Sequence, residues 1–402
     1  MNNQENYDII LIHMLPRLHS YYLNIIKALS KECTIGVYYM PCNELTHRRN
    51  QLNNEETDRL IFDLYVEFGA EILDNSKNFD CNLLLLPQYS FDKNRIKTIN
   101  YNSIIMLGAF AYGGYLLKEF REIGGSKFWT YEEKIFKDVV KVNKQKEIAQ
   151  LFEIREFGLP HKKYPAFDFS NLEIDYLIAY PTRVFLREKY KENDLNKSII
   201  DLMKNIPREK NIYFKEHNVN DPSGKKYVVK GDEIITISES SHFGEQPVFK
   251  KAVSRIGKVL IIPLSFFKVL LRLIIRKDYQ TKSNNSRVIG YVSKSLIKRR
   301  TISLSDVTPH HYLNIYHFLP FVRNGVITGI STCQWNALYE RIPVYNCDNQ
   351  EFSNTFPNYN VVNNYYVPPC NGKLIFDENN YKKVKPPEDK EDMIEMIKNE
   401  IQ

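Results

Sequence analysis

The sequence predicts an α/β protein with two doubly wound, Rossmann-like domains. Short apolar segments alternate with amphipathic segments along most of the chain, which is typical of parallel sheets covered by helices on both faces. The chain has 402 residues, longer than a single hydrophobic core usually supports. The alternation weakens between residues 108 and 169 and then restarts, so a domain boundary is expected there.

The expected elements follow from this alternation. In the first half, strands are expected over residues 8–13, 34–39, 81–86 and 103–107, and helices over 20–31, 55–68 and 129–142. In the second half, strands are expected over 176–179, 211–215 and 233–237, and helices over 195–205, 311–318 and 390–401. The expected domains are 1–165, 166–385 with an insertion at 245–300, and a C-terminal helical segment, 386–402.

The sequence pattern of residues 326–346 predicts a buried strand, a turn of small residues, a helix and a second strand. Such a turn places backbone N–H groups at the helix start, where the helix dipole favours an anion such as phosphate. Gly329 allows close approach of the backbone, and Ser331 and Thr332 can cap the helix. The alternative is an ordinary βαβ corner whose turn residues only cap.

The net charge of +7 is concentrated in one segment. Residues 250–300 carry a local charge of +13, which leaves −6 for the rest of the chain. Within the segment, basic residues recur on one face of an apolar helix, and a bilayer-spanning helix would bury them at a cost of roughly 2.5–3.5 kcal/mol each. We therefore expect an amphipathic element on an anionic membrane surface, contacting it through Lys258, Phe266, Phe267, Lys268, Arg272 and Arg276. Packing against the protein itself is the alternative, and no motif supports nucleic acid binding.

The six cysteines are scattered, without CxxC pairs or the spacing of metal ligands. No hydrophobic signal sequence precedes Tyr7. These observations predict a reducing cytoplasm, no structural zinc, and cysteines that serve as small buried apolar residues.

Two doubly wound domains create a ligand cleft at the carboxyl ends of their strands. Polar residues follow several expected strands there. In the first domain they are His13 and His19, with Gly108 after a later strand.

The second-domain motifs resemble those of GT-B enzymes of bacterial surface polysaccharide synthesis. They are Tyr-Pro-Thr-Arg after one strand, Tyr-Phe-Lys-Glu-His after the next, and Thr-Gly-Ile-Ser-Thr…Trp-Asn-Ala-Leu…Ile-Pro-Val near the end. The family includes capsule glycosyltransferases, lipopolysaccharide enzymes and CDP-glycerol glycerophosphotransferases. The resemblance covers roughly residues 170–350. It implies a nucleotide-activated donor held by the second domain, an acceptor held by the first, and no obligatory metal or other cofactor.

The resemblance assigns roles to individual residues. Lys215 and His217 match a Lys-x-His pattern that approaches donor phosphates, and Arg183 falls where a basic or polar side chain faces the cleft. Ser331 and Thr332 match the phosphate-binding turn. His217 could instead be a strand-end histidine bonded to a nearby loop.

The chain also departs from the family pattern. Asn336 stands where relatives commonly carry a glutamate placed for a ribose, and its amide can still hydrogen-bond a sugar hydroxyl. Asn218 replaces a proline, and Leu107-Gly108 replaces a common His-Gly. These departures bear mainly on the identity of the donor.

A transferase needs a base within hydrogen-bond reach of the acceptor hydroxyl. We expect His19 in this role, with His13 as the other candidate, although His19 could simply cap a surface helix. Glu239 and His242 follow an expected strand and are a second candidate pair for acceptor or donor contacts.

These features together predict a transferase peripheral to the cytoplasmic face of the cell membrane. It would move a sugar from a nucleotide-sugar donor to a lipid-linked or polymeric glycan, with inversion favoured because no paired-carboxylate motif is evident. The alternatives are a CDP-glycerol-type polyol-phosphate transferase, a GT-B nucleotide-sugar epimerase, and a non-catalytic membrane-bound scaffold that binds glycans.

Overall fold

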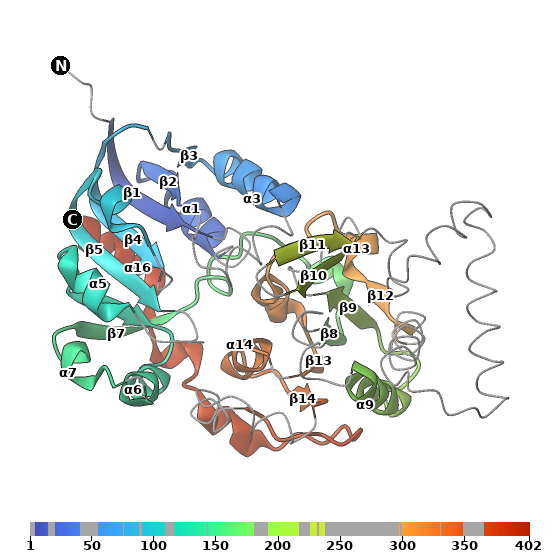
Figure 1. Ribbon diagram of the computed structural model, residues 1–402. Coiled ribbons are helices and arrows are strands. Elements are labelled where there is room, and N and C mark those ends of the chain that lie inside the picture. The colour runs from blue at the N-terminus through green and yellow to red at the C-terminus, as the bar shows by residue number, and fades with distance from the viewer. Residues whose placement is uncertain are drawn as a thin grey trace.

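Two separate parallel sheets form the framework of the protein, and they confirm the two-domain, Rossmann-like fold (Figure 1). The computed structural model describes residues 5–14, 21–40, 55–74, 76–87, 91–108, 116–142, 144–180, 192–216, 226–230, 233–237, 297, 300–329, 331–348 and 366–402. All structural statements below concern these residues.

The first sheet has eight strands in the order β15-β7-β6-β5-β4-β1-β2-β3, and every pair is parallel. Its strands are β1 (Glu5–His13), β2 (Ile35–Tyr39), β3 (Glu71–Ile72), β4 (Phe79–Pro87), β5 (Ile99–Gly108), β6 (Lys127–Thr130), β7 (Glu153–Gly158) and β15 (Glu391–Asp392). The continuous apolar run in β1 reflects burial on both faces of the sheet, as expected for a parallel sheet between two helical layers.

Helices cover both faces of this sheet. One face packs against α1 (Tyr22–Leu29), α3 (Glu55–Glu67) and α16 (Met393–Ile401). The opposite face packs against α4 (Lys93–Ile96), α5 (Leu117–Glu122), α6 (Glu133–Val142) and α7 (Lys146–Ala149). Ile9 and Leu11 point to the first face and Ile10 and Ile12 to the second, because side chains alternate along a strand.

The second sheet has five parallel strands in the order β12-β9-β8-β13-β14. They are β8 (Tyr176–Tyr180), β9 (Ile212–Glu216), β12 (Ile302–Ser303), β13 (Gly325–Thr328) and β14 (Val344–Asn346). The associated helices are α9 (Glu192–Lys204), α13 (Leu304–Val307) and α14 (Cys333–Tyr339). A separate antiparallel hairpin joins β10 (Lys226–Lys230) to β11 (Glu233–Ile237).

One hydrophobic cluster runs through both domains. It includes Ile9 and Leu11 of the first sheet, Leu177 and Val326 of the second, and Leu338 of α14, all fully buried. The two sheets therefore share core contacts along the face that carries α1 and α14.

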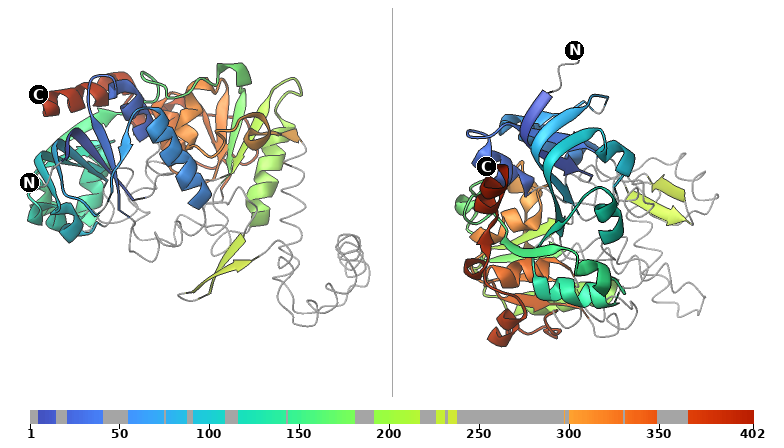
Figure 2. Two further views of the ribbon diagram at one scale, coloured as in Figure 1. Left: turned by 90° about the horizontal axis from the view of Figure 1, so that it is seen from above. Right: turned by 90° about the vertical axis from the view of Figure 1, so that its left-hand side faces the viewer.

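The C-terminal segment links the two domains. Short 3-10 helices at η7 (Glu378–Lys383) and η8 (Pro387–Asp389) follow the second domain, and then β15 pairs with β7 of the first sheet. Asp392 accepts hydrogen bonds from the Ile394 and Glu395 backbone N–H groups and so caps α16. Figure 2 shows α16 lying alongside α1 on the first domain.

A buried ion pair closes the junction between the domains. Lys390 Nζ lies 2.6 Å from Glu132 Oε2, and both side chains are at least 95% buried. The ammonium also lies over the rings of Tyr131 and Tyr339, at 5.2 and 4.6 Å from their centroids. Burial lowers the pKa of Lys390, and the charge of Glu132 opposes that shift. A second buried contact, His161 Nε2 to Glu340 Oε1 at 2.9 Å, lies at the same junction.

Several sequence expectations are corrected by the structure. The helix expected at 129–142 begins only at Glu133, because Trp129 belongs to β6. The helix expected at 311–318 is absent there, replaced by 3-10 turns η4 (Ile315–His317) and η5 (Leu319–Phe321). Aromatic packing competes with helix formation at this point, since the Phe318 ring stacks on Phe169 at 4.5 Å. The strand expected at 233–237 forms, but in the hairpin and not in the main sheet.

The end of the expected insertion at 245–300 packs against the second domain. Ile297 is fully buried in the core beside α9, and the Arg300 guanidinium donates to the carbonyls of Met203 and Ile206 near the end of that helix. Residues 238–296, with all the expected membrane contacts, lie outside the described residues. Within the described part of the chain, no helix is both long and apolar enough to cross a bilayer.

We predict that Lys390→Met destabilises the protein by about 3–5 kcal/mol, because it leaves the Glu132 carboxylate buried without its cation. Urea unfolding followed by circular dichroism measures this change. The double variant Lys390→Met/Glu132→Gln should recover part of the loss. Lys77→Met removes an exposed ion pair with Glu5 and serves as the control, with little expected effect. Equal effects of Lys390→Met and Lys77→Met would rule out the proposed role of the buried pair.

Candidate functional site

The candidate site lies at the carboxyl ends of the strands, where β13 leads through a turn into α14. The sequence prediction of strand, turn, helix and strand over 326–346 is confirmed by β13, α14 and β14. The Thr328 hydroxyl donates to the Ala179 carbonyl at 2.9 Å and joins the end of β13 to β8. The turn is therefore fixed to the middle of the sheet.

Of the two residues expected to cap the helix, Ser331 and Thr332, only Ser331 makes a side-chain hydrogen bond within the described residues of the turn. Ser331 Oγ accepts a hydrogen bond from the Cys333 N–H at 3.3 Å, whereas Thr332, at the N-cap, makes no side-chain capping bond. The buried Gln334 amide donates to the Gly329 carbonyl and accepts from the Val367 N–H, both at 2.9 Å. Sequence reasoning missed Gln334, since nothing in its local pattern indicates a partner 33 residues away.

A side chain at position 329 would collide with Asp348, which explains the glycine in this turn. A Cβ at this position would meet both carboxylate oxygens of Asp348 at 2.9 Å. Asp348 is buried and follows β14. The predicted anion-binding turn thus has a carboxylate beside it, which any bound anion must avoid or neutralise.

Lys215 brings a positive charge to the same region. It lies at the carboxyl end of β9, is 5% exposed, and its Nζ donates to the His311 carbonyl at 2.9 Å. Burial lowers its pKa to about 7, while the electrostatic influence of Cys333 and Glu216 opposes that shift. Its ammonium also lies over the ring of Phe318, 5.8 Å from the centroid. The role of Lys215 in binding donor phosphates stays a prediction.

Asn336 does not point to an open ribose site. It is 7% exposed, and its Oδ1 accepts a hydrogen bond from the Tyr131 hydroxyl of the first domain at 3.2 Å. Burial raises the pKa of Tyr131 well above its usual value, so this phenol stays protonated and able to donate. In this structure the amide serves the contact between the domains.

His13 ends β1 and is fully buried among aromatic rings. Its Nδ1 lies 3.5 Å from the Tyr65 hydroxyl, and its ring packs edge-on against Tyr22 at 4.4 Å. The role of His13 as a base stays a prediction. Gly108 is also buried, at the end of β5 opposite Thr130 of β6.

Other expected site residues lie outside the described residues. They are His19, Arg183, His217, Glu239 and His242. Among the residues that the structure describes, no group of three or more His, Cys, Asp or Glu side chains is placed to hold a metal ion.

Two cysteines meet beside the turn. Cys347 and Cys370 follow the paired residues Asn346 and Pro369, and their Sγ atoms are 3.9 Å apart. The hydrogen bond from Cys347 lowers the pKa of Cys370 to about 7, although burial opposes this. The expectation of six simple buried cysteines is therefore incomplete for this pair.

The similarity of this chain to known proteins lies in its overall fold. No family model matches the chain, and no curated protein matches it. One similar solved structure is an S. aureus MnaA–UDP co-structure, with TM-score 0.43 and 10% identity over 94% of this chain and 90% of that chain. Another is a putative UDP-N-acetylglucosamine 2-epimerase from Listeria monocytogenes, with TM-score 0.39 and 9% identity over 85% of this chain and 79% of that chain.

We predict that Cys370 reacts with iodoacetamide with a midpoint near pH 7, because its thiolate forms as the pH rises through that value. Mass spectrometry of the alkylated peptide against pH measures the midpoint. Cys347→Ala removes the hydrogen-bond donor and should move the midpoint upward, towards 9. Cys81, whose pKa burial raises to about 12, is the unreactive internal control. An unchanged midpoint in Cys347→Ala would contradict the assignment.

Proposed function

We propose that this protein is an enzyme that acts on nucleotide-activated sugars and binds the donor diphosphate between Lys215 and the turn before α14. The observation that carries the proposal is the burial of Lys215 at the carboxyl end of β9, in the same sheet whose strand β13 leads into the turn. A buried ammonium is stabilised by an anion within about 4–6 Å, and a diphosphate supplies two negative groups. The helix start adds a favourable dipole to the same site.

The carboxylate of Asp348 lies beside this turn, so a bound diphosphate must be held away from it. Gly329 keeps the backbone close enough to donate N–H groups. In this arrangement the phosphates lie on the Lys215 side of the turn. The sugar then extends towards the first domain, where the acceptor or reacting groups belong.

Two reactions are proposed for the bound sugar. The first is transfer to a lipid-linked or polymeric glycan, which the motif resemblance supports. The second is epimerisation, the reaction named for the Listeria monocytogenes structure. Epimerisation needs no acceptor and leaves the nucleotide attached, so product analysis separates the two. A CDP-glycerol-type transferase or a non-catalytic glycan-binding scaffold remain the other candidates.

Nucleotide binding should depend on Lys215. We predict that UDP, CDP, GDP or CMP raises the apparent Tm of the protein, since a ligand that binds only the folded state stabilises it. Lys215→Met, which keeps the apolar stem, should abolish the shift without unfolding the protein. The shift should shrink as the pH rises above about 7, because free Lys215 then loses its charge.

Thermal denaturation with each nucleotide at pH 6.5 and 8.5 makes the measurement, with exposed Lys146→Ala as the matched control. An equal shift in Lys215→Met would reject the proposed diphosphate position, and no shift with any nucleotide would favour the scaffold. With the nucleotide sugar as substrate, release of free nucleotide only with a glycan acceptor indicates transfer. A change in the sugar with the nucleotide still attached indicates epimerisation.

We further propose that the basic segment beginning at residue 250 binds an anionic membrane surface and brings the enzyme to its acceptor. Removing residues 250–294 should release the protein from phosphatidylglycerol vesicles while its melting transition persists. This deletion keeps Ile297 and Arg300, which pack on the second domain. Vesicle flotation is the measurement, and undiminished flotation of the shortened protein would refute the membrane role.

A further inference from the structure

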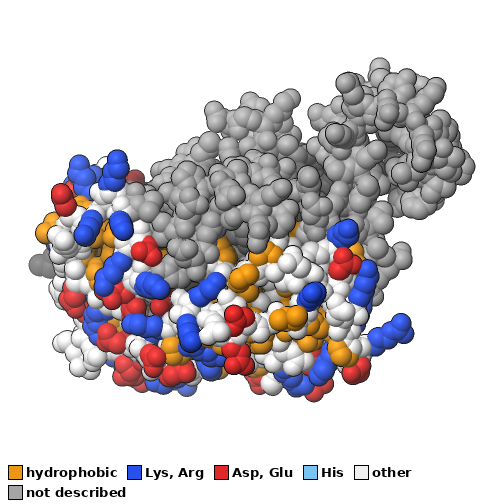
Figure 3. Space-filling view, turned by 90° about the horizontal axis from the view of Figure 1, so that it is seen from below, with side chains coloured by type: hydrophobic (Ala, Val, Ile, Leu, Met, Phe, Trp, Pro, Cys, Tyr) orange, Lys and Arg blue, Asp and Glu red, His pale blue; other side chains and the backbone are white. Residues whose placement is uncertain are grey.

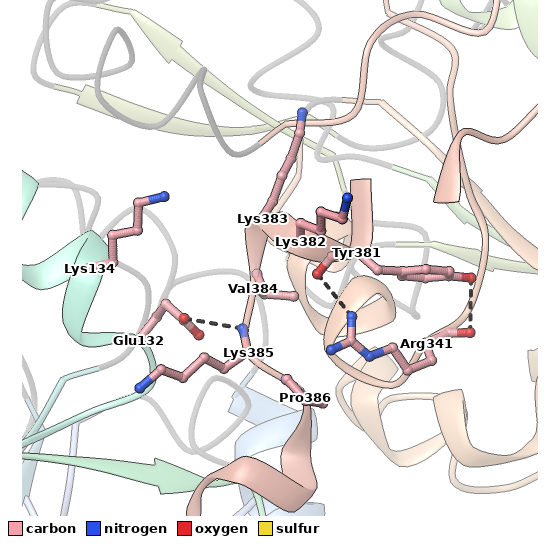
Figure 4. Close-up of a pocket in the computed structure, with 9 residues that line it drawn as sticks. All are labelled: Glu132, Lys134, Arg341, Tyr381, Lys382, Lys383, Val384, Lys385 and Pro386. Atoms are coloured by element: carbon pink, nitrogen blue, oxygen red, sulfur yellow. Dashed lines mark hydrogen bonds between the residues drawn. The ribbon is translucent and has the colours of Figure 1, made fainter. Parts of the chain in front are cut away.

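A cationic cavity lies at the other end of α14 from the candidate site. Its volume is about 420 Å³. It is lined by residues of α6 and its approach, the end of α14, and the C-terminal segment: Glu132, Lys134, Arg341, Tyr381, Lys382, Lys383, Val384, Lys385 and Pro386. Figure 4 shows Glu132 and Lys134 on one side and Lys382, Lys383 and Arg341 on the other.

The cavity and the candidate donor site are separate. Arg341 follows the last turn of α14, whereas Cys333 begins it, and seven residues of helix span about 10 Å. The helix dipole at this end is negative, so the dipole does not create an anion site here. Any affinity for anions must come from side chains.

Five of the nine lining residues are Lys or Arg. One is a carboxylate, Glu132, and it is paired with Lys390. Of the five, Lys385 pairs with Glu156 at 2.5 Å. By contrast, positive and negative side chains are interspersed over the described part of the face in Figure 3.

Three of these cations donate to neutral oxygens. Arg341 Nη1 donates to the Tyr381 carbonyl and Lys382 Nζ to Asn379 Oδ1, both at 2.9 Å, and Lys383 Nζ donates to the Tyr366 carbonyl. None forms an ion pair with a carboxylate in the described part of the chain. Burial lowers the pKa of Lys383, which an added anion would reverse.

Arg341 is held in an unusual conformation. Its φ is 59°, the left-handed region, at the position after a helix where glycine is usual. The Tyr381 hydroxyl donates to its carbonyl at 3.0 Å, and the guanidinium lies over the Tyr381 ring at 5.4 Å. One hydrogen bond and one ring contact thus orient the guanidinium beside the cavity, and a second hydrogen bond holds the Arg341 backbone. A fixed guanidinium is suited to bidentate binding of phosphate oxygens.

We propose that this cavity binds a small compound with two or more phosphate negative charges, held by Arg341, Lys382 and Lys383. The cavity is within the usual size range for small-molecule sites, roughly 300–1,000 Å³. Because its walls come from both domains and the segment that joins them, a bound phosphate compound would also hold the domains together. This site is separate from the proposed donor site, and binding here would act on the contact between the domains.

Inorganic pyrophosphate titrated by isothermal calorimetry tests the proposal. The titration uses the Lys215→Met protein, so that the proposed donor site does not contribute. Arg341→Gly suits the φ of 59° and removes the guanidinium, and Lys382→Ala removes an ammonium. Each should weaken pyrophosphate binding by about tenfold or more. Lys146→Ala, an exposed basic residue on α7, should leave the affinity unchanged.

Sulfate at matched ionic strength should bind more weakly than pyrophosphate, since the cavity offers several cations to a multiply charged ligand. Thermal melts of each variant confirm that the fold is kept. No measurable binding to Lys215→Met, or equal affinity across Arg341→Gly, Lys382→Ala and Lys146→Ala, would overturn the proposal. The nucleotide experiments on the protein without these substitutions remain informative in either case.

Discussion

The buried contact between Lys390 and Glu132 fixes the C-terminal segment to the first sheet, and Tyr339 of α14 packs against the same ammonium. Glu132 follows β6 of the first sheet, and Lys390 immediately precedes β15, which joins the same sheet after the chain has left the second domain. Without the pair, the C-terminal segment would have to bury an ammonium between two tyrosine rings with no counter-charge. Through the Tyr339 ring, α14 is in contact with this junction.

The local elements of the fold could be predicted from sequence because their patterns are local. The apolar run in β1 and the strand, turn and helix around Gly329 depend on periodicity and turn chemistry within a few residues. The helix expected at 311–318 failed because aromatic packing against Phe169 decides that segment. Long-range packing of this kind leaves no periodic mark in the sequence.

The candidate site shows the same division. The positions of Lys215 and the turn could be predicted because both follow strands, and all parallel strands in a sheet end at one edge; their role in binding stays a proposal. The true contacts of Asn336 and Gln334 could not be found, since Tyr131 and Val367 come near them only through tertiary structure. From the sequence, the Asn336 amide is expected to bind a sugar hydroxyl. In the structure its oxygen accepts a hydrogen bond from the Tyr131 hydroxyl of the first domain.

Three lysines with little or partial exposure, Lys215, Lys383 and Lys390, differ in what stabilises their charge. Lys390 is buried beside a carboxylate, so its charge is matched within the protein. Lys215 is buried and Lys383 is half-buried; each donates a hydrogen bond to a carbonyl oxygen, and burial lowers the pKa of each. A carbonyl dipole stabilises an ammonium less than a full negative charge does. Lys383 would therefore gain more from an external anion than Lys390 would, and it lies in η7, which contacts α14. Since α14 packs between the two domains, occupation of either end would act on the same junction.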